Sequence, residues 1–256
     1  MNYETRRVLV TVKAYPTPSK KYVETVCVAG IDIEKYEWIR LYPIRFRDLE
    51  ENKKFKKYNI IEIKVFKPKD DKRPESYKVD PYSINIIDYL KTDDKWSRRK
   101  SIVLPTVSNS MCEIYNQSKL NRKSLGVFKP INVDFYWKKS RKVNLEETKS
   151  YYSQLSLLDK KKIAIEHIPY DFHYKFFCHN ESNCAGHDFS IIDWELKQAY
   201  RDWRHYYEGE ELLLSKIKEK WLSITSEKKD AYFYVGNMKR FRDIFMILGV
   251  FSTPKV

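Results

Sequence analysis

Runs of Val, Ile and Tyr recur through residues 1–70, and several of them alternate between apolar and polar positions. A period of two is typical of strands with one face buried. Proline-containing and charged stretches separate the runs, as turns do. The pattern predicts strands at residues 7–15, 22–31, 36–43 and 59–67, and further strands that end at Leu90 and Trp137. These strands favour an antiparallel sheet or a partly closed barrel.

The last third of the chain changes to helical spacing. Ser190 and Asp193 have the spacing of a capping box, which predicts a helix that starts at Ser190. Apolar residues then follow a period of three to four until Gly209, a residue that commonly ends helices. A second helix is predicted over residues 210–224, and strands over residues 231–236 and 243–251. A weaker helical pattern covers residues 108–120. The predicted fold class is therefore α+β.

A polar and charged segment at residues 143–164 predicts a linker between two domains. Residues 1–142 would form a basic, β-rich domain, and residues 165–256 a smaller domain of two helices and a β-hairpin. The sequence contains no run of the roughly 18 uncharged apolar residues that a membrane-spanning helix needs, and its start lacks the apolar core of a signal peptide. We therefore expect a soluble, cytoplasmic protein without a membrane partner.

Positive charge is concentrated in the first part of the chain. The net charge is +14 overall, and residues 1–150 contribute 33 Lys and Arg against 20 Asp and Glu, a net of +13. Such an asymmetry attracts a phosphate backbone or another polyanion. The alternative is that the surplus Lys residues only keep the protein in solution.

Basic residues also alternate with aromatic ones in several short segments, a mixture that suits phosphate contacts combined with base stacking. It favours single strands or distorted duplexes, because no helix-turn-helix or zinc-finger spacing is present. For any one cluster, a solvated surface is the simpler alternative. The predicted nucleic-acid contacts are Lys53, Lys54, Lys56, Lys57, Arg98, Arg99, Lys138, Lys139, Arg141, Lys239 and Arg240.

The segment from Phe177 to Asp188 has the spacing of a metal site. Cys178, Cys184 and His187 follow a C-x5-C-x2-H pattern, in which two thiolates and an imidazole can converge on one tetrahedral ion. Structural Zn²⁺ is the expected ion, and His179 is the predicted fourth ligand, with His173 and Asp188 as other local candidates. The alternative is a group of buried free Cys residues beside a hydrogen-bonded His.

A second constellation is similar to the PD-(D/E)xK nuclease signature, in which two carboxylates hold a divalent ion and a Lys assists the attacking water. The matching residues would be Asp171, Glu195 and Lys197. The helical pattern places the last two in a helix, where residues two apart point in different directions. The acids at the helix start can instead complement its dipole. Motifs of NTPases, serine hydrolases and zinc proteases are not present in the sequence.

Four segments carry a resemblance to a family of prokaryotic proteins found near defence genes: residues 26–49, 71–77, 178–196 and 232–251. Among proteins of this kind, the chain resembles the partner subunits of short archaeal Argonautes. The resemblance implies a role in holding guide and target strands beside an Argonaute. It identifies no individual functional residue.

These observations predict a non-catalytic nucleic-acid-binding subunit of a prokaryotic antiviral complex, paired with an Argonaute-like protein. A metal-dependent nuclease is the first alternative. The second is an adaptor that binds only proteins through its Tyr- and Trp-rich surfaces.

Overall fold

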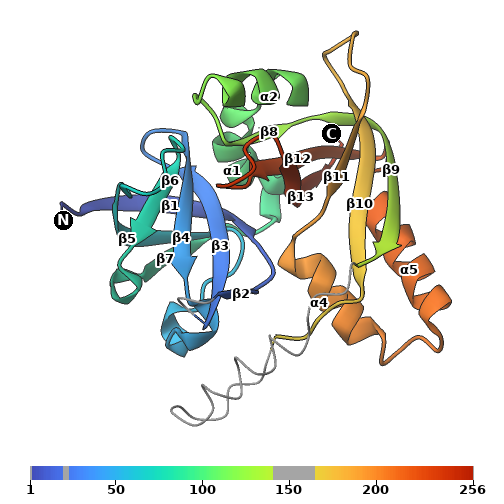
Figure 1. Cartoon of the computed structure of the whole chain (residues 1–256), viewed down its shortest axis with the longest axis horizontal. Helices are drawn as coiled ribbons and strands as arrows, with labels where there is room; N and C mark the ends of the chain where they lie inside the picture. The colour runs from blue at the N-terminus through green and yellow to red at the C-terminus, as the bar shows by residue number, and fades with distance from the viewer. Residues whose placement is uncertain (1, 20–22, 141–164, 256) are drawn as a thin grey trace.

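The computed structural model describes residues 2–19, 23–140 and 165–255 (Figure 1). Its fold is α+β, which confirms the predicted class, with a β-rich N-terminal barrel and a C-terminal part that contains two helices and a hairpin. The predicted linker and Arg141 lie outside the described residues. None of the described helices is long and apolar enough to cross a membrane.

The barrel contains five strands in the order β1, β3, β4, β6 and β5, and it closes because β5 also pairs with β1. All these pairings are antiparallel except that of β4 with β6. Two more strands, β2 and β7, extend the sheet beside β3 and β5. The bounds are β1 Glu4–Lys13, β2 Thr17–Ser19, β3 Val23–Asp32, β4 Glu37–Ile44, β5 Asn59–Phe66, β6 Ser76–Val79 and β7 Asn85–Tyr89.

Strand β1 is apolar on both faces because both are buried. Val8 and Val10 point into the barrel, whereas Leu9 and Val12 pack outside it against the C-terminal part. Gly30 allows β3 to approach this strand closely, since a Cβ at that position would lie 2.2 Å from the carbonyl oxygen of Leu9. The part of the barrel's outer face that packs against the C-terminal part is therefore also core.

A helical segment connects the barrel to the C-terminal part. Helix α1 (Asp93–Val103) begins with a left-handed turn, and Ser110 caps helix α2 (Met111–Lys119) by accepting a hydrogen bond from the Glu113 amide at 2.9 Å. The sequence pattern predicts α2 but not α1. The described residues before α2 also contain four short 3-10 helices: η1 Phe46–Asp48, η2 Glu51–Lys53, η3 Pro81–Ser83 and η4 Leu104–Thr106.

Two three-stranded antiparallel sheets build the C-terminal part, in the orders β11-β10-β9 and β13-β12-β8. The β13-β12-β8 sheet lies between the barrel and the β11-β10-β9 sheet. Helices α4 and α5 cover the lower end of the C-terminal part, as seen in Figure 1. The bounds are β8 Leu125–Phe128, β9 Pro130–Lys139, β10 Tyr170–Cys178, β11 His187–Ser190, α4 Trp194–Trp203, α5 Glu210–Ser223, β12 Lys229–Asn237 and β13 Phe245–Pro254.

The predicted start of the first C-terminal helix at Ser190 is wrong. Ser190 is the last residue of β11, where it pairs with His173 and is held in an extended conformation. Helix α4 begins at Trp194 instead, and Asp193 caps it by accepting a hydrogen bond from the Glu195 amide at 3.2 Å. Strand pairing has priority over the local capping signal because it satisfies the backbone groups of β11.

Candidate nucleic-acid groove and metal centre

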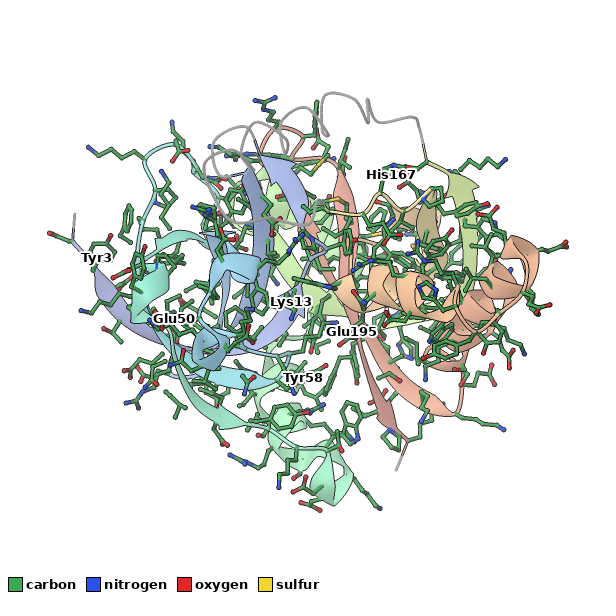
Figure 2. All side chains as sticks on the ribbon, turned by 90° about the horizontal axis from the view of Figure 1, so that it is seen from below. Tyr3, Lys13, Glu50, Tyr58, His167 and Glu195 are labelled. Carbon is green, nitrogen blue, oxygen red and sulfur yellow. The ribbon has the colours of Figure 1, made fainter. Side chains whose placement is uncertain are left out.

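A cavity of about 1180 Å³ lies between the barrel and helices α4 and α5. Figure 2 shows the molecule from below, and three residues that line this cavity, Lys13, Tyr58 and Glu195, lie close together near its centre. We call it the groove. Its cationic lining residues are Lys13, Lys56, Lys57, Arg99, Lys220, Lys228 and Lys229, and its aromatic ones are Tyr58, Tyr89, Trp96, Trp194 and Trp203.

The groove carries an excess of positive charge. Seven Lys and Arg residues line it, against the two acids Glu195 and Asp202, which gives a formal net charge of +5. Lys57 is buried and pairs with Asp193 at 2.8 Å and with Glu195 at 3.1 Å. Among the described residues, the other six cations form no ion pair. Arg99 is buried against aromatic rings, so the charge that can reach a ligand comes mainly from the five remaining lysines.

Arg99 organises the aromatic wall of the groove. Its buried guanidinium lies 3.8 Å from the ring centroid of Tyr58 and 4.9 Å from that of Trp96. It also donates a hydrogen bond to the Leu90 carbonyl at 2.7 Å. These contacts hold two ring systems in place beside the cavity, and cation–π contacts of this kind favour a fixed geometry.

The structure separates the predicted nucleic-acid contacts into groups. Lys56, Lys57 and Arg99 line the groove. The other described members of the predicted set lie elsewhere: Lys53 and Lys54 pair with Glu50 and Glu51, Arg98 with Asp88, and Lys239 with Asp70, while Lys138 and Lys139 lie at the end of β9 and Arg240 in the turn between β12 and β13.

Four groove cations were missed by the sequence prediction, namely Lys13, Lys220, Lys228 and Lys229. The adjacent pair Lys228 and Lys229 offered a signal, since it precedes a predicted strand. Lys13 offered none, because it ends an apolar strand and only the packing of α4 against the barrel places it in a cavity.

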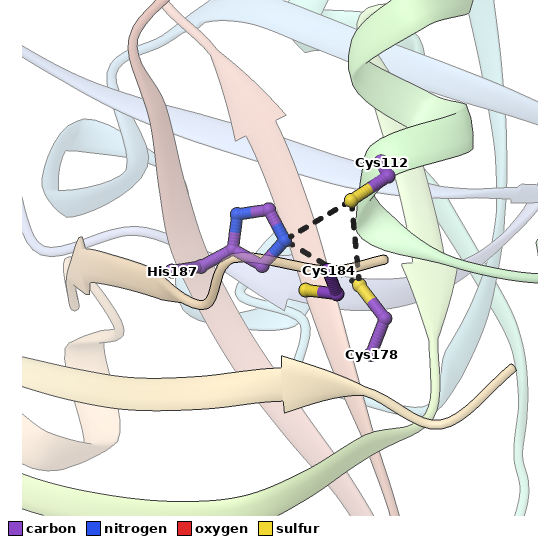
Figure 3. A group of neighbouring side chains, drawn as sticks. All are labelled: Cys112, Cys178, Cys184 and His187. Carbon is purple, nitrogen blue, oxygen red and sulfur yellow. Dashed lines mark hydrogen bonds between the residues drawn. The ribbon is translucent and has the colours of Figure 1, made fainter. Parts of the chain in front are cut away.

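A second site contains Cys112, Cys178, Cys184 and His187, whose possible ligand atoms all lie within 4.8 Å of one another (Figure 3). The Cys112 and Cys178 sulfurs are 4.0 Å apart, and the Nε2 of His187 lies 3.5 Å and 3.4 Å from them. Metal–sulfur bonds of about 2.3 Å place tetrahedral sulfur ligands about 3.8 Å apart. The cluster can therefore hold a metal ion after small movements.

Burial and close spacing shift the pKa values of all four groups in the cluster. Burial and the neighbouring thiols raise the pKa of Cys112 to about 12, and burial also raises the pKa of Cys178. Burial disfavours charge on Cys184 too, but hydrogen bonds from neighbouring groups lower its pKa overall. Burial lowers the pKa of His187, which favours the neutral imidazole that binds metals. A divalent cation would offset the repulsion between the thiolates and release their protons.

The fourth member of the cluster is Cys112 and not the predicted His179. Cys178 ends β10 with its side chain in the core, so the next residue points away from it. His179 is exposed and its Nδ1 lies 2.6 Å from Oδ1 of Asn180. The other candidates, His173 and Asp188, pair with each other at 2.9 Å. Helix α2 supplies Cys112 from 66 residues earlier in the sequence.

The three residues of the nuclease pattern do not share one cavity. Asp171 and Lys197 line a second cavity of about 310 Å³, whereas Glu195 lines the groove. The Lys197 ammonium donates a hydrogen bond to the Tyr170 carbonyl at 2.7 Å, and Asp171 accepts one from Ser140 at 3.1 Å. This arrangement does not present two carboxylates to a common ion.

Two family models together match almost the whole sequence. Residues 4–105 match the domain of unknown function DUF8758, and residues 107–256 match the domain of unknown function DUF8757. Among curated proteins, none matches the chain. The two models meet at Thr106, the last residue of η4, where the chain passes from the barrel and α1 to α2.

Proposed function

The chain belongs to the DUF8757 family, and we propose that it binds nucleic acid by holding a single strand in the groove between the barrel and helices α4 and α5. The observation that carries this proposal is the combination of cationic and aromatic side chains in one cavity. Cations can contact the phosphates while the aromatic rings stack on exposed bases. A duplex hides the base faces, so a single strand uses this lining better.

Two features of the groove support stacking. Tyr89 is 44% exposed at the edge of the cavity, and Trp96 and Tyr58 are held beside it by Arg99. Rings that are already fixed lose little conformational entropy when a base stacks on them. Each stacked base contributes about 1–3 kcal/mol.

The test is the affinity of a fluorescent single-stranded oligonucleotide, measured by anisotropy over a range of salt concentrations. A variant with both Lys228→Ala and Lys229→Ala should bind more weakly, and its salt slope should be smaller by about 0.7 for each phosphate that the variant no longer neutralises. Tyr89→Ala should weaken binding by about 1–3 kcal/mol with an unchanged salt slope, because stacking releases no counterions.

The matched control is the pair Lys53→Ala and Lys54→Ala, whose ammonium groups lie outside the groove and pair with Glu50 and Glu51. It should keep nearly full affinity. Equal losses in both double variants would show that the groove is not the binding surface. An affinity that does not change between low and moderate salt would count against nucleic-acid binding altogether.

For the metal centre, the proposed ion is structural Zn²⁺. Three Cys and one His form a ligand set typical of closed tetrahedral zinc sites, which leave no position for a substrate. The ion would join α2 to β10 and to the start of β11. Its proposed role is therefore to stabilise the C-terminal part by linking Cys112 to Cys178, 66 residues apart in the sequence.

The antiviral role and the pairing with an Argonaute-like protein stay part of the proposal, and the sequence resemblance supports them. Co-expression with such a protein, followed by size-exclusion chromatography, tests the pairing. We expect a complex that also contains nucleic acid. A complex with protein alone would favour the adaptor function instead.

A further inference from the structure

Lys13 is held in one place on the wall of the groove. It is the last residue of β1, and its Nζ lies 4.2 Å from the ring centroid of Phe46 and 4.5 Å from that of Trp194. Two ring faces at this distance from the nitrogen favour the ammonium form and fix its position. Lys13 and Trp194 both line the groove, so the charge is held where a ligand can reach it.

The ammonium of Lys13 has no counterion of its own. The nearby acids are Asp193 and Glu195, and both form ion pairs with Lys57. Among the described residues, no carboxylate forms an ion pair with Lys13. Burial and the charge of Lys57 lower the pKa of Lys13 to about 8, which still leaves most of the amine protonated at neutral pH. An anion bound in the groove would supply the missing partner.

A cation that is already fixed and half-buried binds an anion at a lower cost than a hydrated, mobile one. An exposed lysine of the groove, such as Lys56, loses side-chain freedom and bound water when it contacts a phosphate. Lys13 loses both when the protein folds, because its side chain then lies between two rings. Lys13 should therefore contribute more to binding than an exposed lysine does.

The charges around Lys13 also indicate which kind of phosphate fits. Those that act most strongly on its ammonium belong to Asp193, Glu195, Lys56 and Lys57. With Lys13 they form a set whose formal net charge is +1. An internal phosphodiester carries one negative charge and balances this set, whereas a terminal phosphate carries about 1.5 to 2 at neutral pH. The surplus charge of a terminal phosphate would lie near Glu195, whose side chain is 66% exposed.

We propose that Lys13 anchors one internal phosphodiester of the single strand bound in the groove, so that the strand passes through the groove and does not end in it. The inference rests on the proposed function and specifies its substrate as an internal segment of a single strand. The Lys13 ammonium donates hydrogen bonds to a non-bridging oxygen of that phosphate, while Lys57 keeps its two acidic partners. A circular strand, which has no ends, is then as good a ligand as a linear one.

The experiment uses the full chain and fluorescent single strands of one sequence and length: a linear strand with a 5′-hydroxyl, a linear strand with a 5′-phosphate, and a circle. Anisotropy gives the affinity of each over a range of salt concentrations. Lys13→Met removes the charge and keeps an unbranched apolar side chain between the rings of Phe46 and Trp194. Lys13→Arg keeps the charge, and Lys56→Met is the matched control at an exposed groove lysine.

We expect Lys13→Met to bind about tenfold or more weakly than the wild-type protein, because a charged hydrogen bond is lost. Its salt slope should be smaller by about 0.7, since one phosphate is no longer neutralised. Lys13→Arg should recover most of the affinity, and Lys56→Met should lose less than about threefold, as exposed charges do. The circle and both linear strands should bind the wild-type protein equally well.

Equal losses in Lys13→Met and Lys56→Met would overturn the inference and leave strand binding in the groove intact. Weaker binding by Lys13→Met with an unchanged salt slope would also overturn it, because the lysine would then act only through the structure. A preference of the wild-type protein for the 5′-phosphate over the circle would show that the groove holds a strand end. A wild-type protein that binds none of the strands would refute the proposed function, and the inference with it.

Discussion

Asp193 is the residue whose replacement should reveal how the groove is held together. Its buried carboxylate pairs with the buried Lys57 at 2.8 Å, which ties α4 to the barrel segment before β5. The same carboxylate caps α4 through the Glu195 amide. Burial opposes the charge on Lys57, but Asp193 and Glu195 raise its pKa overall, so this lysine stays an ammonium. Removal of Asp193 leaves a buried cation with one partner.

The expected magnitude follows from these two contacts. Breaking a buried ion pair by removing one partner costs about 3–5 kcal/mol, and the remaining partner Glu195 places this case near the lower end. Loss of an N-cap adds about 1 kcal/mol. Asp193→Ala should therefore lower the free energy of unfolding by about 4 kcal/mol. Asp193→Asn can keep the cap and should lose about 1 kcal/mol less.

Urea denaturation followed by fluorescence measures these free energies, since six Trp residues report on the fold. The double variant Lys57→Met with Asp193→Ala completes a mutant cycle. It should lose less than the sum of the single variants, because it leaves no unpaired buried charge. Additive losses, or a loss below about 1 kcal/mol for Asp193→Ala, would refute the reasoning. Such a result would mean that water or another group compensates Lys57.

Two further predictions concern the metal centre and a partly buried ion pair. Cys112→Ser should lower both the amount of bound metal, measured by elemental analysis, and the melting temperature. The control Cys27→Ser, which lies outside the cluster, should keep the metal. Full metal content in Cys112→Ser would exclude Cys112 as a ligand. Burial opposes ionisation of Asp71, but Arg73 lowers the pKa of this carboxyl to about 2. The stability that the ion pair contributes to the folded state is therefore present above about pH 4 and is lost as the pH falls toward 2. The wild-type protein should accordingly be about 1 kcal/mol more stable than Asp71→Asn at pH 7, and the difference should vanish in acid titrations of stability; a constant difference would show that the charge is not its cause.

Local pattern was sufficient for most of the strands. The alternation at residues 22–31 and 36–43 predicted β3 and β4 nearly to their ends, because side chains in a strand face opposite sides by geometry alone. Helix α5 was predicted as well, since its apolar face repeats every three to four residues. Helix α1 was not predicted, because the charged segment 91–100 carries no such face.

The two sites depended on contacts between distant segments. Three of the four cluster residues were evident from their spacing within ten residues of sequence, but Cys112 joins them only through the packing of α2 on β10. The groove likewise combines Lys13 of β1, Arg99 of α1 and Trp203 of α4. No sequence window contains these residues together.

The sequence by itself determined the fold class, most strands, the charge asymmetry and three of the metal-cluster residues, because each follows from local periodicity, composition or short spacing. Only the tertiary structure decided that Asp193 caps α4, that Cys112 completes the cluster and that Lys13 borders the groove. The physical reason is that strand pairing and core packing select one arrangement among many that are locally acceptable, and those long-range contacts leave no signature in neighbouring residues.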